Sequence, residues 1–238
     1  LTMTMYDRTP AEECVVVDRW DGGLGWVSHP EETGVRASHA FVDEDDGVWV
    51  VDPLEAPGVD DVLDSLGTVT GVVILSNYHA RDAEAFATRY DVPIYLPSWL
   101  SRAADRIERP VRTVTDTIGS SGFAVRRYAP FPGWSEAIAY READGTLYVP
   151  DALGTAPLYT VGDERLGTYL LCRLTPPRDA FDGVTPRRIL VGHGTGVFED
   201  AASALAEALD GARRGFPKAL WQNGWGQLRA LTEALGAA

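Results

Sequence analysis

Residues that could bind a metal ion or transfer protons cluster directly after an apolar run. Residues 72–75 are Val, Val, Ile and Leu, and the polar segment 76–82 follows them without a gap. An apolar run that leads through a polar cluster into the helical pattern of residues 83–90 predicts a buried strand, a short loop and a helix. In α/β folds, ligands and metal ions usually bind at this edge of the sheet. We therefore expect four of these side chains to line a site: Asn77, His79, Arg81 and Asp82.

Three further polar clusters flank predicted strands. They are the segment 133–136, which contains Trp134 and Glu136, then Asp151 after residues 146–149, and His193 after residues 188–191. Glycines on both sides of His193 allow a backbone and a ligand to approach closely. His79 and Asp82 are three residues apart and could face one cavity, although Asp82 could equally cap the helix that it precedes.

The elements that would position these residues follow from the hydrophobic pattern. Residues 38–42 and 48–51 predict a hairpin across a polar turn, and Asp52 with Pro53 closes it. Other predicted strands are residues 14–18, 92–96, 111–114, 123–128, 137–140, 146–149 and 188–191. Predicted helices are residues 57–66, 83–90, 98–108, 200–213 and 216–235, the last interrupted at Asn223 and Gly224. Residues 154–186 predict loops with one short element, and no linker divides the chain, so we expect a single domain over residues 1–238.

The charge of the chain limits its surroundings and its partners. It has 35 acidic and 21 basic residues, a net charge of -14, and Lys218 as its only lysine. An acidic, lysine-poor surface is typical of halophilic proteins, because concentrated salt screens the self-repulsion. A GC-rich genome, which favours Arg over Lys, is the alternative. In either case no basic stripe is present for phosphates, so we expect no nucleic-acid partner.

Cysteine content and hydropathy predict a reducing compartment. Cys14 and Cys172 stand apart in apolar contexts, without the spacing of a zinc ribbon or a disulfide framework. No apolar run is long enough to cross a membrane, and residues 1–13 lack the apolar core of a signal peptide. We expect a cytoplasmic protein without a membrane partner. Trp221 and Trp225, one helical turn apart, predict core packing, with a homodimer or lid surface as the alternative.

The order of these motifs resembles the metallo-β-lactamase superfamily. The resemblance lies in residues 36–42 and 48–53 as an opening hairpin, the His79 loop, Pro132 with Gly133, Asp151, and His193 between two glycines. It extends over about residues 14–200. It implies an α/β (α+β) fold, a four-layer αβ/βα sandwich of two mixed β-sheets with helices on the outer faces. It also implies metal ions at the sheet edge and a hydrolase that uses a metal-activated water.

The chain departs from the metal-binding motif of that superfamily. In the frame His-x-His-x-Asp-His, the first His is replaced by Asn77, the Asp by Arg81 and the last His by Asp82. Trp134 follows the Pro-Gly pair where a His is expected. The resemblance therefore implies a divergent member with a degraded metal site, in which His79, Asp151 and His193 keep their original types.

Two hypotheses follow from these departures. In the first, the protein is a hydrolase with one divalent metal (Zn, Mn or Fe), bound by residues from the set His79, Asp82, Asp151 and His193. Carboxylate and imidazole ligands suit such ions. Asp82 or His79 would accept a proton during catalysis. In the second, the site binds no metal because Arg81 pairs with Asp151 or Asp82, and the protein is a non-catalytic binding or scaffold protein.

Both hypotheses place a small-molecule ligand or substrate in the same pocket. The residues that we expect to contact it are Asn77, Tyr78, Arg81, Trp134 and Glu136.

Overall fold

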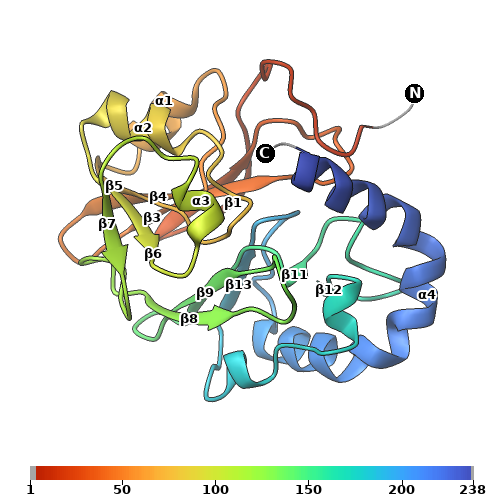
Figure 1. Cartoon of the computed structure of the whole chain (residues 1–238). Helices are drawn as coiled ribbons and strands as arrows, with labels where there is room; N and C mark the ends of the chain where they lie inside the picture. The colour runs from red at the N-terminus through yellow and green to blue at the C-terminus, as the bar shows by residue number, and fades with distance from the viewer. Residues whose placement is uncertain (1–3, 237–238) are drawn as a thin grey trace.

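A seven-stranded sheet forms the first half of the protein (Figure 1). The structure is a computed structural model that describes residues 4–236, with side chains up to residue 227. The strand order is the chain order, and β1 to β4 pair antiparallel whereas β4 to β7 pair parallel. The strands are β1 Val15–Trp20, β2 Gly23–Val27, β3 Ala37–Val42, β4 Gly47–Val51, β5 Thr68–Val73, β6 Ile94–Pro97 and β7 Val111–Val114.

Helices cross between the parallel strands of this sheet, because parallel neighbours require a crossover connection. Their apolar side chains, among them Leu63, Phe86 and Leu100, pack with Trp26 and Val72 into one core. These helices are α1 Val59–Asp64, α2 Ala83–Tyr90 and α3 Ser101–Ala104.

The second sheet has the order β13-β10-β9-β8, in which only the β10–β13 pair is parallel. Its strands are β8 Ala124–Tyr128, β9 Glu136–Arg141, β10 Thr146–Val149 and β13 Arg188–Val191. A small sheet of β11 Leu153–Gly154 and β12 Gly167–Thr168, two 3-10 turns, η1 Leu171–Arg173 and η2 Asp179–Phe181, and the helix α4 Ala201–Gly236 complete the chain.

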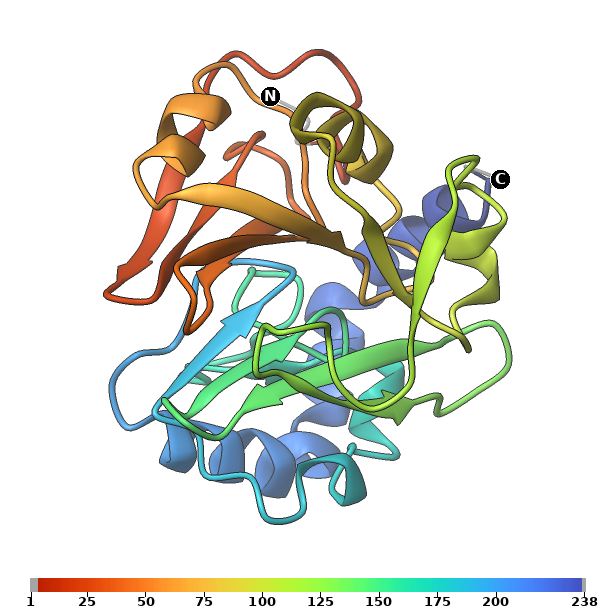
Figure 2. The same ribbon diagram turned by 90° about the vertical axis from the view of Figure 1, so that its left-hand side faces the viewer.

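The two sheets face one another, with helices on both outer sides (Figure 2). Successive side chains of a strand point to opposite faces of its sheet, so each strand of the second sheet contributes to two cores. In β10, Tyr148 packs between the sheets, whereas its neighbours Leu147 and Val149 pack towards α4. The Phe41 and Phe123 rings join the sheets across the middle, with centroids 4.7 Å apart. The predicted four-layer αβ/βα sandwich is therefore confirmed.

Several element predictions were wrong. Residues 98–108 contain only the short α3, and α4 continues through Pro217, Asn223 and Gly224 as one helix. Proline inside a helix removes a hydrogen bond without ending the helix when tertiary packing supports both sides. Trp221 and Trp225 are 83% and 85% exposed, so they do not pack into the core. Among the described residues no helix combines the length and hydrophobicity that crossing a bilayer requires.

Strand β2 is absent from the predicted elements. Its sequence, Gly-Leu-Gly-Trp-Val, contains two glycines, which are depleted in strands. Gly25 is required there because a Cβ at this position would lie 2.7 Å from the ring of His39 on the neighbouring strand. The close approach of β2 and β3 therefore requires a glycine at position 25, and this glycine hides the strand pattern in the sequence.

Asp144, in the turn between β9 and β10, predicts a pH-dependent contribution to stability. Its carboxylate accepts side-chain hydrogen bonds from Arg141, Thr146 and Arg188 at 2.8–3.1 Å. Burial alone would raise the pKa of Asp144, but these hydrogen bonds and the two arginine charges lower it to about 2. A pKa below the unfolded value stabilises the fold above about pH 4, and this stabilisation disappears as the pH falls through about 2.

We expect Asp144→Asn to lower the free energy of unfolding by about 1–2 kcal/mol at pH 7, after allowance for its partial exposure. At about pH 2 the variant and the parent should have nearly equal stability. Urea unfolding of both proteins at the two pH values measures the difference. An equal loss at both pH values would show that the carboxylate charge is not its cause.

Candidate metal and substrate site

The site lies where strands of both sheets end. Asp52 follows β4, His79 lies in the loop after β5, Asp151 follows β10 and His193 follows β13. Both β4–β5 and β10–β13 are parallel pairs, so their carboxyl ends lie side by side at one edge of each sheet. The topology therefore brings four polar residues together that are far apart in the sequence.

Single β-bridges connect the ends of the two sheets at this edge. Ser76 pairs with Glu136, and Arg36 pairs with His193. The hydroxyl of Ser76 also donates a short hydrogen bond to Oδ2 of Asp151. These connections hold the loops from the two sheets at fixed positions relative to each other.

His79, Asp151 and His193 converge at the centre of the edge. Oδ1 of Asp151 lies 3.1 Å from Nε2 of His79 and 3.1 Å from Nε2 of His193. All three side chains are buried, and their ligand atoms lie within 4.8 Å of one another. Two imidazoles and one carboxylate at such distances could hold one metal ion.

The Nδ1 atom of each imidazole forms a hydrogen bond on the side away from Asp151, which fixes the orientation of both rings. Nδ1 of His79 donates to Oδ2 of Asp52 at 2.9 Å, and Nδ1 of His193 donates to the carbonyl of Gly34 at 2.7 Å. Each Nε2 atom is then directed at Asp151. Histidines that ligate metal ions usually show this arrangement, with the second nitrogen on a carboxylate or a carbonyl.

Asp52 is itself firmly held. Its carboxylate also accepts hydrogen bonds from the backbone N–H of Leu75 at 2.8 Å and the hydroxyl of Tyr148 at 2.7 Å. The residue is fully buried and has a φ of 48°, a left-handed conformation that costs energy in a residue other than glycine. The surrounding hydrogen bonds offset that cost, and they direct the carboxylate at His79.

Burial and the neighbouring charges shift the pKa values of the three converging residues in opposite directions. Burial and Arg81 lower the pKa of His79, but Asp151 and Asp52 on the two sides of the ring raise it, and the net direction is upward. Burial lowers the pKa of His193. Burial would raise the pKa of Asp151, but His79 and His193 hold it well below its ordinary value. The pKa values of the two imidazoles are therefore shifted in opposite directions, although both rings approach the same carboxylate oxygen.

Arg81 points into the site but binds the backbone there. Its Nη1 donates to the carbonyls of Ala37 and Asp52 at 2.7 and 2.8 Å, and Nη2 lies 3.3 Å from the carbonyl of Gly192. Nη2 is also 3.2 Å from Nε2 of His79. Within the described part of the chain Arg81 forms no ion pair with Asp151 or Asp82, so the expected pairing is not what holds it. Its guanidinium instead connects the ends of β3, β4 and β13.

Asp82 does not join the three converging residues. It begins α2, without a side-chain cap, and its Oδ2 accepts the backbone N–H of Glu55 at 2.8 Å. Asp82 still lines the cavity described below. Asn77 is buried and its Oδ1 faces the backbone N–H of Ala103 at 3.5 Å, so this side chain packs against α3.

Glu136 and Trp134 support the second half of the site. Oε2 of Glu136 accepts the backbone N–H groups of Asp151 and Ala152 at 2.7 and 3.2 Å, and Oε1 accepts Nε1 of Trp134 at 3.2 Å. Burial, followed by the charge of Asp151, raises the pKa of Glu136 to about 8. Glu136 therefore positions Asp151 and Trp134 from behind, whereas Trp134 and Tyr78 themselves line the cavity.

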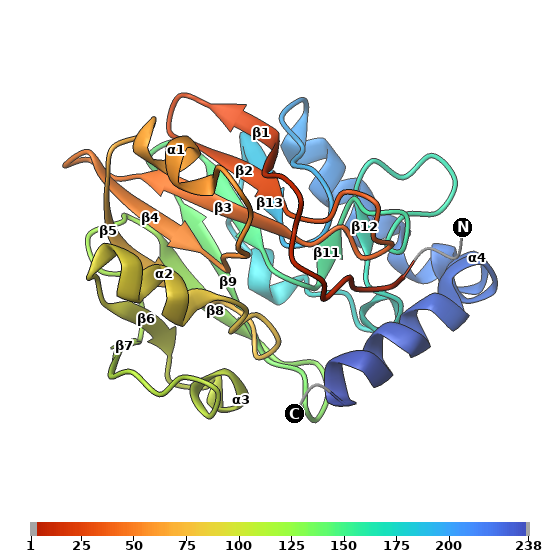
Figure 3. The same ribbon diagram turned by 90° about the horizontal axis from the view of Figure 1, so that it is seen from above.

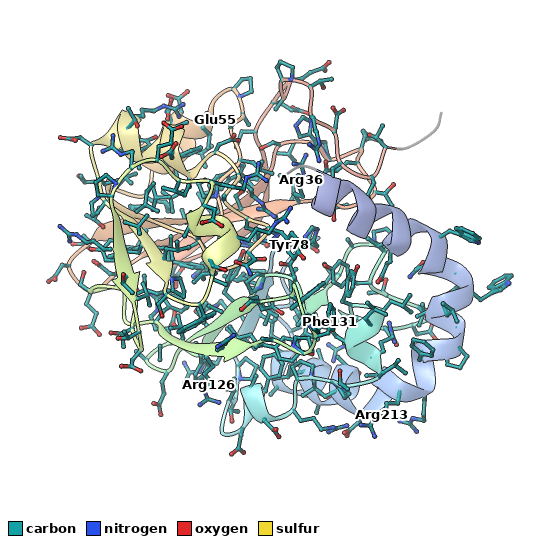
Figure 4. All side chains as sticks on the ribbon, in the orientation of Figure 1. Arg36, Glu55, Tyr78, Arg126, Phe131 and Arg213 are labelled. Carbon is teal, nitrogen blue, oxygen red and sulfur yellow. The ribbon has the colours of Figure 1, made fainter. Side chains whose placement is uncertain are left out.

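A cavity of about 520 Å³ opens onto these residues, within the range of about 300–1,000 Å³ for small-molecule sites. Figure 4 shows Arg36 and Tyr78, two of its lining residues, between the first sheet and α4. The N-terminal segment, dark red in Figure 3, passes over this part of the molecule, and its Tyr6 lines the cavity. Asp7 fixes this segment, because its backbone N–H donates to Glu32 and its carbonyl accepts Nη2 of Arg36.

Sequence reasoning missed several residues of the site. Asp52 was expected only to close a turn, and Tyr6, Tyr159 and Tyr169 were not considered. The Asp-Pro pair directly after a strand carries a signal that could have identified Asp52. The tyrosines come from the N-terminal segment and from the irregular part of residues 154–186, where no periodic pattern exists to place them.

Comparison with solved structures identifies the fold. DIM-1 metallo-β-lactamase has a TM-score of 0.61 at 12% identity, covering 86% of this chain and 99% of that one. A metallo-β-lactamase from Pontibacter korlensis gives a TM-score of 0.59 at 15% identity, covering 84% and 99%. The chain has the metallo-β-lactamase fold.

The same fold occurs in a larger protein. The flavodiiron protein from Giardia intestinalis gives a TM-score of 0.56 at 14% identity, covering 88% of this chain and 61% of that one. No protein-family model matches the sequence, and no curated protein matches it. At these identities the similarity shows the fold alone. Among the residues that the structure describes, one group could hold a metal ion, His79, Asp151 and His193.

The hydrogen bonds of Asp52 predict a large effect of its amide analogue. In Asp52→Asn, the amide nitrogen would face a donor in either orientation, because the Leu75 N–H binds Oδ1 whereas His79 and Tyr148 bind Oδ2. We expect the free energy of unfolding to fall by about 2–4 kcal/mol, measured by urea unfolding. The matched control is Asp45→Asn on an exposed turn, with a change below about 0.5 kcal/mol. A variant as stable as its parent would exclude the assigned role of Asp52.

Proposed function

We propose that this protein is a hydrolase with the metallo-β-lactamase fold that binds one divalent metal ion through His79, Asp151 and His193. A single observation carries the proposal: Oδ1 of Asp151 lies 3.1 Å from Nε2 of both His79 and His193, while the other side of each residue is already bound. Protonation of His79 alone leaves the contact between His193 and Asp151 without a hydrogen. An ion of zinc, manganese or iron would satisfy all three atoms at once.

The chemistry of such an ion, when bound, is to polarise a substrate oxygen and to lower the pKa of a water molecule. The residues of the chain hold the geometry. Asp52 and the carbonyl of Gly34 orient the two imidazoles, and Ser76 binds Oδ2 of Asp151 so that Oδ1 faces inwards. In this proposal the small-molecule substrate occupies the cavity, and Asp82, whose Oδ2 is bound, accepts a proton through Oδ1.

We expect the purified full chain to bind about one equivalent of Zn²⁺, Mn²⁺ or Fe²⁺ per molecule. His193→Ala should abolish this stoichiometric binding, because one of three ligands is lost. Metal analysis after dialysis and calorimetric titration measure both quantities. Asp144→Asn is a matched control on an acidic residue outside the site. Binding that is equal in His193→Ala and its parent, or that is absent from both, would contradict the proposal.

A second candidate is a metal-free binding protein, which the position of Arg81 favours. Its Nη2 lies 3.2 Å from Nε2 of His79, on the side where an ion would bind. A fixed positive charge at such a distance weakens the binding of a cation.

Arg81→Gln distinguishes the two candidates. If the metal site is real, removal of the positive charge should tighten metal binding by about tenfold or more, measured by the same titration. If Arg81 takes the place of the metal, neither the parent nor Arg81→Gln should bind an ion through imidazole. A decrease in affinity on removal of the charge would contradict the electrostatic argument.

A further inference from the structure

Three tyrosine hydroxyls in the cavity have no partner in the described part of the protein. Tyr6, Tyr159 and Tyr169 line the cavity, and none of their hydroxyls takes part in a hydrogen bond with a described residue. Tyr159 and Tyr169 are only 2% and 6% exposed. None of these hydroxyl oxygens is among the enclosed side-chain atoms that lack a partner, and all three residues line the cavity, so the hydroxyls are available to a molecule bound there.

Other tyrosines of the chain show the usual behaviour. The hydroxyl of Tyr78, in the same cavity, donates to the carbonyl of Gly133 at 2.9 Å, and that of Tyr148 donates to Asp52 at 2.7 Å. The free hydroxyls are therefore a local property of one wall of the cavity and not of tyrosine packing throughout the protein.

The three tyrosines lie on the His193 side of the proposed metal site. The Tyr159 ring stacks on His193 with centroids 5.5 Å apart, and the Tyr6 ring lies 6.2 Å from the same imidazole. The Tyr169 ring lies 5.9 Å from that of Tyr159 and 4.6 Å from that of Trp134. Burial is the largest cause that raises the pKa of each of the three tyrosines, and the negative charge of Asp151 also contributes.

The arginines of the cavity are already engaged. Glu32 binds Arg36 through both carboxylate oxygens, and three backbone carbonyls bind the terminal nitrogens of Arg81. Arg8 and Arg106 also have partners. The three phenols are neutral donors on an aromatic wall of the cavity, which His29 also lines. Such donors suit the oxygen of a singly charged or uncharged organic group better than the several charges of a phosphate.

We propose that Tyr6, Tyr159 and Tyr169 form a donor site for the carboxylate or ester-carbonyl oxygen of a small planar organic ligand. The body of the ligand would pack against Trp134 and the tyrosine rings, where apolar and aromatic surface is available. This inference rests on the proposed function in that it names the substrate class of the same cavity, but its binding step requires no metal ion.

Binding of benzoate and of methyl benzoate to the full chain tests the proposal, with inorganic phosphate as a competitor. Ligand-observed NMR on chelator-treated and on metal-loaded protein measures the affinities. We expect at least one of the two aromatic probes to bind in both preparations. Stronger binding of benzoate assigns the site to a carboxylate, and stronger binding of methyl benzoate assigns it to an ester carbonyl. Failure of both probes to bind overturns the proposal.

Substitution by phenylalanine separates the hydroxyls from the rings. Tyr159→Phe and Tyr169→Phe should each weaken binding of the probe about 3–10-fold, the effect of one neutral hydrogen bond. Tyr140→Phe, whose hydroxyl binds the carbonyl of Thr185 outside the cavity, is the matched control and should change binding less than about twofold. Equal affinity in all variants, or displacement of the probe by phosphate, would overturn the proposal.

Thermal unfolding shows whether the hydroxyls have a structural role. The midpoints of Tyr159→Phe and Tyr169→Phe should match the parent, because no hydrogen bond of the fold is lost. Tyr148→Phe should unfold at a lower temperature, because it loses the bond to Asp52. Lower midpoints for the first two variants would mean that the hydroxyls serve the fold. If the chain takes up no metal ion on loading but still binds the probe through its tyrosines, the metal-dependent function is refuted and this inference stands.

Discussion

The contact between one oxygen of Asp151 and two imidazole nitrogens is the constraint on which the site depends. Oδ1 lies 3.1 Å from Nε2 of His79 and of His193, in a buried environment. Three lone pairs in such proximity repel one another unless hydrogens or a cation lie between them. The fold nevertheless maintains the geometry, because Ser76, Asp52 and the carbonyl of Gly34 bind the outer side of each group.

Arg81 changes the charge balance of this arrangement. Asp52 and Asp151 contribute two buried negative charges, and Arg81 is a positive charge near both, held by three carbonyls. One negative charge remains, which either a proton on His79 or a bound cation compensates. Within the described part of the chain, the arginine forms no ion pair with either carboxylate. It lowers the charge that an ion would neutralise, and it connects strand ends of both sheets at the mouth of the site.

The fold was predictable because strong, regular signals carry it. The hairpin that ends at Asp52 and the alternating strands of the second sheet follow from local patterns, and the resemblance to metallo-β-lactamases supplied the layers. Strand β2 was missed because its glycines serve a contact with β3 that is invisible in the sequence. The length of α4 was missed because tertiary packing overrides the helix-breaking tendency of Pro217.

The site was predictable only in part. Motif spacing placed His79, Asp151 and His193 at adjoining strand ends, and the structure brings them together. Spacing could not reveal which way a side chain turns. Asp82 binds the backbone of Glu55, Arg81 binds carbonyls, and Glu136 turns away from the cavity to hold Asp151. These outcomes depend on contacts between segments that are distant in the sequence, as does the aromatic wall from the irregular region.

The central claim is that a metal ion binds through imidazole at this edge and not merely to the acidic surface. X-ray absorption at the zinc edge, on the full chain loaded with one equivalent of zinc, tests it most directly. We predict two imidazole nitrogens and a carboxylate oxygen at about 2.0–2.2 Å from the ion. A spectrum with oxygen ligands alone, unchanged in the His193→Ala variant, would contradict the account.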